Sequence, residues 1–325
     1  MDAGIHVLHI NMTETMNQKQ KAGRTINLNA GRIGKILVFL GASLSLLYSI
    51  EMRGDIYEDY INSYADMAQA QQEEYGIPAS IILAQGLLES SAGRSRLASE
   101  GNNHFGIKCH ADWEGETMLR DDDRPNECFR VYSNAAESYR DHSLFLKRPR
   151  YSSLYDLQIT DYPGWARGLR ECGYATDPNY ADKLISIIER YALYTYDDPS
   201  LTNPEETVAF IRETLSSSHP VRRSNGLHYV VAFPGDTYAS IAKEFGMSEK
   251  KLKEYNDSKE KKVKEWEEVY LEPKSDEAPE GALSATIGEG ENMRSISQRY
   301  GIKLSVLKGL NKKAKDKPGT VLRLR

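Results

Sequence analysis

Apolar residues cover most of the surface of one predicted helix, which runs from Pro78 to Gly93. Pro78 suits the first helical turn, where its missing N–H costs no hydrogen bond, and Gly93 suits the stop. Glu89 is the one carboxylate in this stretch and shares a helix face with Gln85, one turn earlier. We expect the helix to be largely buried, because large apolar side chains leave it little polar surface: Ile81, Ile82, Leu83, Leu87 and Leu88.

Helical spacing of apolar residues recurs before and after this stretch. Residues 55–74 show it, and further helices are predicted at 135–146, 164–169 and 179–194. Residues 105–132 are instead rich in Gly, Asp and aromatic side chains and contain turn signals, a texture typical of a short irregular sheet. The pattern predicts an α+β unit over residues 55–198 that is mainly helical and carries a small β lobe.

The C-terminal part of the chain contains an internal repeat with a constant offset of 55 residues. Each copy is predicted to form a strand, two short helices and a closing strand, over residues 227–274 and 283–325. Residues 199–226 are predicted to hold one further amphipathic helix and a Ser-rich linker. The positions that pair are Gly235 with Gly290, Asp236 with Glu291, Ser240 with Ser295, Ile241 with Ile296, Phe245 with Tyr300, Gly246 with Gly301, Leu252 with Leu307 and Asn256 with Asn311.

An uncharged apolar run at residues 36–50 follows Arg32 and Lys35 within an N-terminal segment, residues 1–54. Fifteen residues are short for a membrane span and typical of the core of a signal peptide. Residues 1–35 form an unusually long leader, so Met12 and Met16 are alternative starts. Because no Ala-x-Ala site follows the core, cleavage and retention as a membrane anchor both stay open. We expect export to the periplasm or cell envelope, with the protein either anchored or secreted.

Composition narrows the class of protein. The chain of 325 residues has 40% hydrophobic and 27% charged residues and a net charge of −5, which suits a globular protein of two or three units and gives no case for nucleic-acid binding. Of three cysteines, Cys109 and Cys128 lie in the predicted β lobe and are the favoured disulfide in an exported protein, with Cys172 left over. No motif indicates a redox or nucleotide cofactor, and no metal ligands are assigned.

Glu89 is the candidate for acid chemistry. Burial beside Leu87 and Leu88, together with the negative end of the helix dipole, is expected to raise the pKa of its carboxyl group. A carboxyl group that stays protonated near neutral pH is what a general acid for glycosidic cleavage requires. The alternative is a glutamate that simply reaches solvent at a helix end.

Six short motifs follow one another between residues 88 and 180. In this order the chain resembles glycoside hydrolase family 73, the peptidoglycan N-acetylglucosaminidases of the flagellar and autolysin type. The resemblance implies a lysozyme-like α+β fold and cleavage of the β-1,4 bond after N-acetylglucosamine in murein glycan strands. The motifs are Leu88-Glu89-Ser90, Asn102-Asn103-His104-Phe105-Gly106-Ile107-Lys108, Trp113-Glu114-Gly115, Phe129-Arg130-Val131-Tyr132, Ser138-Tyr139-Arg140-Asp141-His142 and Gly173-Tyr174-Ala175-Thr176-Asp177-Pro178-Asn179-Tyr180.

The resemblance also assigns roles to single residues. Glu89 matches the general acid, and Tyr174 matches a tyrosine that helps the N-acetyl group or the attacking water. Asp141 and His142, on a predicted helix, are expected to be scaffold residues rather than catalysts. The residues expected in or beside the sugar groove are Asn103, Phe105, Trp113 and Tyr180.

A second catalytic acid is harder to place, because the chain departs from the family pattern in the β lobe. Asp122 is the first choice, Asp121 and Asp123 come next, and Glu127 is disfavoured because it adjoins Cys128. The acidic stretch is alternatively a solvated turn or a divalent cation site. A distant carboxylate that activates water would invert the anomeric centre, whereas attack by the substrate's own acetamido group would retain it.

The repeat resembles the LysM domain, which binds glycans that contain N-acetylglucosamine. The second copy diverges, since Thr237 becomes Asn292 at the paired position. Together the parts imply an exported endo-β-N-acetylglucosaminidase whose partner is peptidoglycan, both as substrate and as LysM ligand. Rivals are a lytic transglycosylase or muramidase on the same fold and an inactive wall-binding scaffold; amidase activity is not expected.

Overall fold

The computed structural model describes residues 56–110, 113–121, 126–198 and 219–325. Internal contacts divide the chain into two units, Met1–Gly54 and Asp55–Arg325. The predicted signal or anchor at 36–50, the predicted helix after Asn203 and the candidate acids Asp122 and Asp123 lie outside the described residues. Within the ranges described, no helix combines the length and apolarity needed to cross a membrane.

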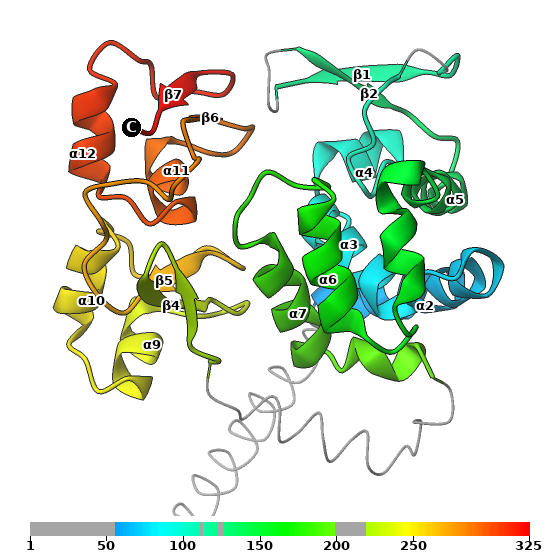
Figure 1. The fold of residues 1–325 in the computed structure, drawn as a ribbon, viewed down its shortest axis with the longest axis horizontal. Coiled ribbons are helices and arrows are strands. Elements are labelled where there is room, and N and C mark those ends of the chain that lie inside the picture. The colour runs from blue at the N-terminus through cyan, green and yellow to red at the C-terminus, as the bar shows by residue number, and fades with distance from the viewer. Residues whose placement is uncertain (1–55, 111–112, 122–125, 199–218) are drawn as a thin grey trace, which may run out of the picture. The chain divides into compact units, whose positions relative to one another are not determined.

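Helices build the first part of the second unit (Figure 1). They begin with α2 (Ile56–Tyr75), α3 (Ala79–Ser90) and α4 (Arg96–Gly101), and continue after a hairpin with α5 (Ala135–Leu146), the 3-10 helix η1 (Pro149–Asp156), α6 (Tyr162–Glu171), α7 (Tyr180–Arg190) and η2 (Leu193–Tyr196). The predicted helices are therefore present. Helix α3 packs against α2, α6, α7 and η2, and only Leu88 and Glu89 within it are less than fully buried.

Helix α3 ends earlier than Gly93, the predicted stop. Ser91 and Ala92 both adopt left-handed backbone conformations, with φ of 53° and 54°, and Gly93 follows with φ of 77°. Left-handed φ is uncommon for residues other than glycine and carries strain. The amide of Gly93 donates to Ser90 Oγ over 2.7 Å, which holds this turn. The chain therefore reverses immediately after Glu89.

The predicted β lobe is a two-stranded antiparallel hairpin of β1 (Thr117–Arg120) and β2 (Glu127–Arg130). Its register pairs Thr117 with Arg130 and Arg120 with Glu127. A disulfide joins Cys109 to Cys128 and ties the segment before the hairpin to its second strand. Mixed helices and small sheets make the fold α+β, as the sequence predicts.

The C-terminal repeats have matching elements. The first contains β3 (Arg222–Ser224), β4 (Leu227–Val231), α9 (Tyr238–Glu244), α10 (Glu249–Tyr255) and β5 (Glu268–Tyr270); the second contains β6 (Ser284–Thr286), α11 (Met293–Arg299), α12 (Leu304–Leu310) and β7 (Val321–Arg323). Strand β3 pairs with β4 and was not expected, because composition predicts a linker there. The backbone of β4 offers an open edge that polar residues such as Arg222 and Ser224 can pair with, whatever their hydropathy.

The paired positions of the repeat have physical reasons. Ser240 and Ser295 complete capping boxes at the starts of α9 and α11. Asn256 exchanges two hydrogen bonds with the backbone of Tyr270 in β5, at 2.8 and 2.9 Å. Asn311 does the same with Arg323 in β7, at 2.7 and 2.8 Å. Each paired asparagine therefore fastens the closing strand of its own copy.

Candidate active site around Glu89

Glu89 lies in the last turn of α3 and is partly buried. Tyr180, the first residue of α7, donates its hydroxyl hydrogen to Glu89 Oε1 over 2.9 Å. The tyrosine itself is only 3% exposed, so this bond forms largely out of solvent. The raised pKa expected for Glu89 stays a prediction.

A chain of buried polar groups continues behind Tyr180. Gln85 Nε2 donates to the Tyr180 hydroxyl over 3.0 Å, and His142 Nε2 lies 3.1 Å from Gln85 Oε1. Burial lowers the pKa of His142 to about 3, so its ring is neutral and Nε2–H is the donor that the Gln85 oxygen requires. Every group donates to the next, and the chain of donors ends on the Glu89 carboxyl. It fixes the orientation of that carboxyl, because neither Gln85 nor His142 has any exposed surface.

Tyr174 lies beside this chain. Its ring stacks on Tyr180 with centroids 5.7 Å apart and meets the edge of His142 at 6.2 Å. Burial first, and the neighbouring Glu89 carboxylate second, raise the pKa of Tyr174 well above its usual value, so the phenol stays protonated. Its hydroxyl is buried and has no hydrogen-bond partner among the residues that the structure describes. A neutral buried phenol of this kind can bind a substrate group or a water molecule.

The 172–179 loop between α6 and α7 carries Tyr174. Gly173 adopts φ of 74°, and the amide of Tyr174 donates to Leu169 O over 2.9 Å. Arg150 donates to the carbonyl oxygens of Cys172 and Gly173, at 2.9 and 2.8 Å. A side chain at position 173 would collide with the Arg150 guanidinium, so glycine suits both the turn and the contact.

Two of the expected groove residues prove to be buried supports. Asn103 is 1% exposed, and its amide bonds the backbone of Ile107 and of Arg130 at 2.8–3.0 Å. Phe105 is 3% exposed and stacks on His142 with centroids 3.9 Å apart. Tyr180 is likewise buried and donates its hydroxyl hydrogen to Glu89. Direct sugar contact by Asn103, Phe105 and Tyr180 stays a prediction.

Trp113 is the expected groove residue that keeps partial exposure. Its Nε1 donates to Glu116 O over 2.9 Å, and the Arg130 guanidinium lies 4.7 Å from its ring centroid. Asp141 accepts from Arg130 at 3.0 Å and from the Tyr132 hydroxyl at 2.5 Å. Asp141 thus supports the residues that hold Trp113, in the scaffold role that was predicted, and the indole is presented on the β lobe.

The two described alternatives for the second acid, Asp121 and Glu127, have partners in the β lobe. Asp121 accepts a hydrogen bond from the backbone of Asn126 over 2.8 Å and so closes the hairpin turn. Glu127 pairs with Lys108 at 2.8 Å. Among the described residues there is no cluster of His, Cys, Asp or Glu that suits a metal ion. Asp122 stays the prediction for this role.

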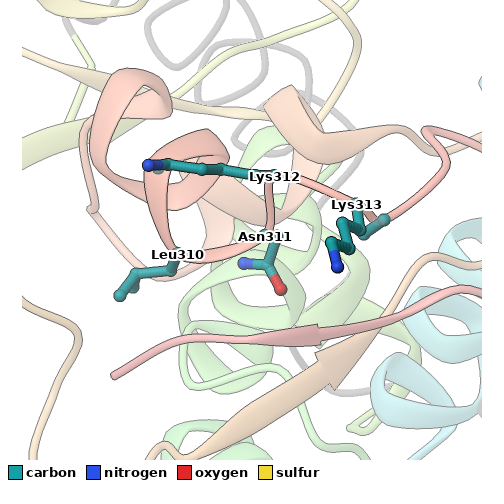
Figure 2. A pocket seen from close by; sticks show the side chains of 6 residues that line it. Leu310, Asn311, Lys312 and Lys313 are labelled. Carbon is teal, nitrogen blue, oxygen red and sulfur yellow. The ribbon is translucent and has the colours of Figure 1, made fainter.

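An open pocket of about 500 Å³ lies on the second repeat (Figure 2). Lys312 and Lys313 line it beside Asn311, which also bonds β7. The lining contains two cations and no carboxylate, so it is chemically distinct from the site at Glu89.

Sequence reasoning placed Gln85 on the helix face of Glu89 but did not predict the hydrogen bond from His142 to Gln85. The one available signal was the place of His142 in the Asp141-His142 motif, which fits a scaffold residue equally well. The ion pair between Lys183 and Glu268 was also not predicted, because the two residues lie 85 positions apart in the sequence.

Two family models match parts of the chain. Residues 65–193 match the glucosaminidase model described as mannosyl-glycoprotein endo-beta-N-acetylglucosaminidase, and residues 231–263 and 285–325 match the LysM domain. The chain is 37% identical over 161 residues to the exo-glucosaminidase LytG of Bacillus subtilis, covering 45% of this chain and 56% of LytG. It is 31% identical over 191 residues to the peptidoglycan hydrolase FlgJ of Vibrio parahaemolyticus, covering 55% and 61%.

The chain thus spans a little over half the length of these two relatives. Among solved structures, a crystal structure titled N-acetylmuramoyl-L-alanine amidase from Staphylococcus aureus is 30% identical, with a TM-score of 0.45 and coverage of 53% of this chain and 52% of that one. At that TM-score the structural likeness adds nothing to the family match.

Proposed function

We propose that the chain is a peptidoglycan hydrolase, because residues 65–193 match a glucosaminidase model and two regions after them match the LysM domain. It cleaves the β-1,4 bond after N-acetylglucosamine within murein glycan strands, as an endo-β-N-acetylglucosaminidase. The LysM domains bind the same polymer and hold the enzyme on it.

The observation that carries this proposal is the Glu89 carboxyl at the end of a buried chain of donors. Glu89 protonates the glycosidic oxygen as the bond breaks, which is the role of the general acid. Tyr180 holds that carboxyl through its 2.9 Å bond, so the proton is delivered in one direction. Trp113, on the β lobe, offers a partly exposed ring on which a pyranose stacks.

The attacking group defines two mechanisms. If Asp122 activates water from the opposite face of the sugar, the anomeric centre inverts. If the substrate's acetamido oxygen attacks instead, the centre is retained, and the Tyr174 phenol donates a hydrogen bond that orients the acetamido group. The buried Tyr174 hydroxyl without a described partner favours the second route.

Mass spectrometry of digested sacculi tests the activity. Products with reducing-end N-acetylglucosamine support the proposal, and Glu89→Gln should yield none of them while still binding sacculi. Anhydro-muramic ends indicate a lytic transglycosylase, reducing-end muramic acid a muramidase, free stem peptides an amidase, and no product from the wild type a scaffold. The length distribution of early products separates endo cleavage from the exo cleavage named for LytG.

Peptidoglycan lies outside the cytoplasm, and we propose that residues 36–50 direct export to the cell envelope. A phosphatase fused after Asp55 should be active outside the cytoplasm; an inactive fusion that stays in the cytoplasm contradicts export. Whether the segment then stays as a membrane anchor is decided by the N-terminal sequence of the mature protein and by its release from washed membranes.

A further inference from the structure

A buried ion triad connects the catalytic region to the first LysM domain. Lys183, in the first turn of α7, places its ammonium group 2.7 Å from Asp177 Oδ2 and 2.8 Å from Glu268 Oε1. Asp177 belongs to the 172–179 loop, and Glu268 is the first residue of β5 in the first LysM domain. The side chain of Lys183 is 13% exposed and that of Glu268 only 3%. The triad is thus largely shielded from solvent.

Asn179 adds a second connection. Its Nδ2 donates to Glu268 Oε1 and to the backbone oxygen of Arg299 in the second LysM domain, each over 3.1 Å. Its backbone N–H donates to Asp177 Oδ1 over 2.8 Å. Asn179 directly precedes Tyr180, so the residue that bonds Glu89 is one peptide bond away from a residue held by both LysM domains.

The charges in this triad depend on one another. Burial opposes the charge of Lys183, but Asp177 and Glu268 outweigh it and raise its pKa. Burial likewise opposes the charge of Asp177, and Lys183 followed by Arg299 reverses this and lowers its pKa. Without the Glu268 carboxylate, Lys183 and Asn179 lose the oxygen to which both of them donate, and a shielded donor that lacks its acceptor is costly. The loop would then rearrange to reach solvent.

Around the triad, the first LysM domain packs directly against α7 and α2. Tyr229 and Tyr270 of the first LysM domain are fully buried and share one apolar cluster with α7. The Tyr229 hydroxyl donates to Asp182 over 2.6 Å, and Arg222 in β3 pairs with the same carboxylate at 3.2 Å. Trp266 Nε1 donates to the Tyr57 hydroxyl at 3.1 Å, which joins the domain to α2.

From this geometry we propose that the first LysM domain positions the active site: Glu268, through Lys183 and Asp177, fixes the 172–179 loop and the start of α7, and thereby Tyr174 and Tyr180 beside Glu89. Glu268 and Lys183 are positioning residues, since neither contacts Glu89. The proposal rests on the proposed function for its effect on rate. It goes beyond wall targeting, because a domain that only tethers the enzyme changes binding to sacculi and leaves turnover of a small soluble substrate unchanged.

Glu268→Gln in the full chain tests this, since it removes the charge and nearly keeps the shape. The matched control is Glu272→Gln, whose exposed carboxylate lies 2.9 Å from the His228 ring and accepts from the His228 backbone N–H in the same domain. On a soluble, uncross-linked murein tetrasaccharide, kcat of Glu268→Gln should fall on the order of tenfold, with KM changed by less than about twofold, because the groove itself is intact. Glu268→Asp, which restores the charge, should recover part of kcat, and binding to sacculi should stay as in the wild type.

Hydrogen exchange of residues 172–183 gives a readout that needs no activity. Exchange there should rise in Glu268→Gln and stay unchanged in Glu272→Gln. A wild type that cleaves no glycan, combined with this rise, refutes the proposed function and leaves the positioning role standing. If the wild type is active, and Glu268→Gln and Glu272→Gln show the same kcat and the same hydrogen exchange, the positioning role is overturned. If Glu268→Gln does not fold, Tyr229→Phe, which removes only the hydroxyl bond to Asp182, must show the same two changes in the same direction, or the proposal fails.

Discussion

Replacing Tyr180 by phenylalanine tests whether the buried chain of donors holds the Glu89 carboxyl. The substitution keeps the ring that stacks on Tyr174 and removes only the hydroxyl. That hydroxyl donates to Glu89 and accepts from Gln85, so two hydrogen bonds are lost together. Tyr174→Phe is the natural control, because the Tyr174 hydroxyl makes no hydrogen bond to any described residue.

The two variants should differ in stability. In Tyr180→Phe the fully buried Gln85 amide keeps a donor without its acceptor, and an unsatisfied buried donor costs about 1–3 kcal/mol of unfolding free energy. At roughly 2–4 °C per kcal/mol for a unit of this size, Tm should fall by about 2–12 °C. Tyr174→Phe removes no protein hydrogen bond, so its unfolding free energy should stay within about 0.5 kcal/mol of the wild type.

The two variants should also differ in rate. Tyr180→Phe frees the general acid to change orientation, which is expected to lower kcat by about 10- to 100-fold. Tyr174→Phe lowers kcat only if the phenol meets the substrate, and most if the acetamido group attacks. The assays are thermal unfolding followed by circular dichroism and initial rates on the soluble murein tetrasaccharide, corrected for the folded fraction. Wild-type Tm and kcat in Tyr180→Phe would refute the reasoning.

Three other predictions follow from the site and its supports. Asp122→Asn should lower kcat and remove the acidic limb of the pH–rate profile if Asp122 activates water; a wild-type profile assigns the attack to the acetamido group. Reduction of Cys109–Cys128, or its replacement by two alanines, should lower kcat by loosening the β lobe, whereas Cys172→Ser should not; equal rates with and without reductant would contradict this. Burial lowers the pKa of His142 from 6.5 to about 3. Between these two pH values the ring binds a proton in the unfolded chain but not in the folded chain. Its contribution to stability is complete above pH 6.5 and is lost towards pH 3 by about 1.4 kcal/mol per pH unit. Denaturant titrations at several pH values should show that the unfolding free energy of His142→Gln falls less with acid than that of the wild type. The same fall per pH unit in both proteins would exclude the buried neutral ring as the cause.

The sequence by itself determined those features that depend on residues close together in the chain. The apolar surface of α3 requires burial whatever covers it, and Pro78 and Gly93 bound it within a few residues. The repeat at offset 55 is equally local: Ser240 and Ser295 complete capping boxes with residues three positions earlier, and Asn256 and Asn311 reach the nearest closing strand. The order of short motifs was enough to identify Glu89 and Tyr174 as candidates.

Only the tertiary structure decided which side chains meet. His142 lies 57 residues from Gln85, and Gln85 lies 95 residues from Tyr180, so their alignment on Glu89 depends on how α3, α5 and α7 cross. The same crossing buries Asn103 and Phe105, which a motif alone places in the groove. Polar and aromatic residues fit either a binding surface or a buried network, and local sequence does not distinguish the two.

The first LysM domain illustrates most clearly that local sequence does not determine which side chains meet. Composition before it predicts a linker, and a linked domain is expected to act by tethering. The packed contact requires β3 to pair with β4 and Glu268 to meet Lys183, 85 residues away. Nothing near Glu268 in the sequence indicates that partner, because a buried ion pair is specified by the three-dimensional approach of two surfaces and not by the pattern along either one.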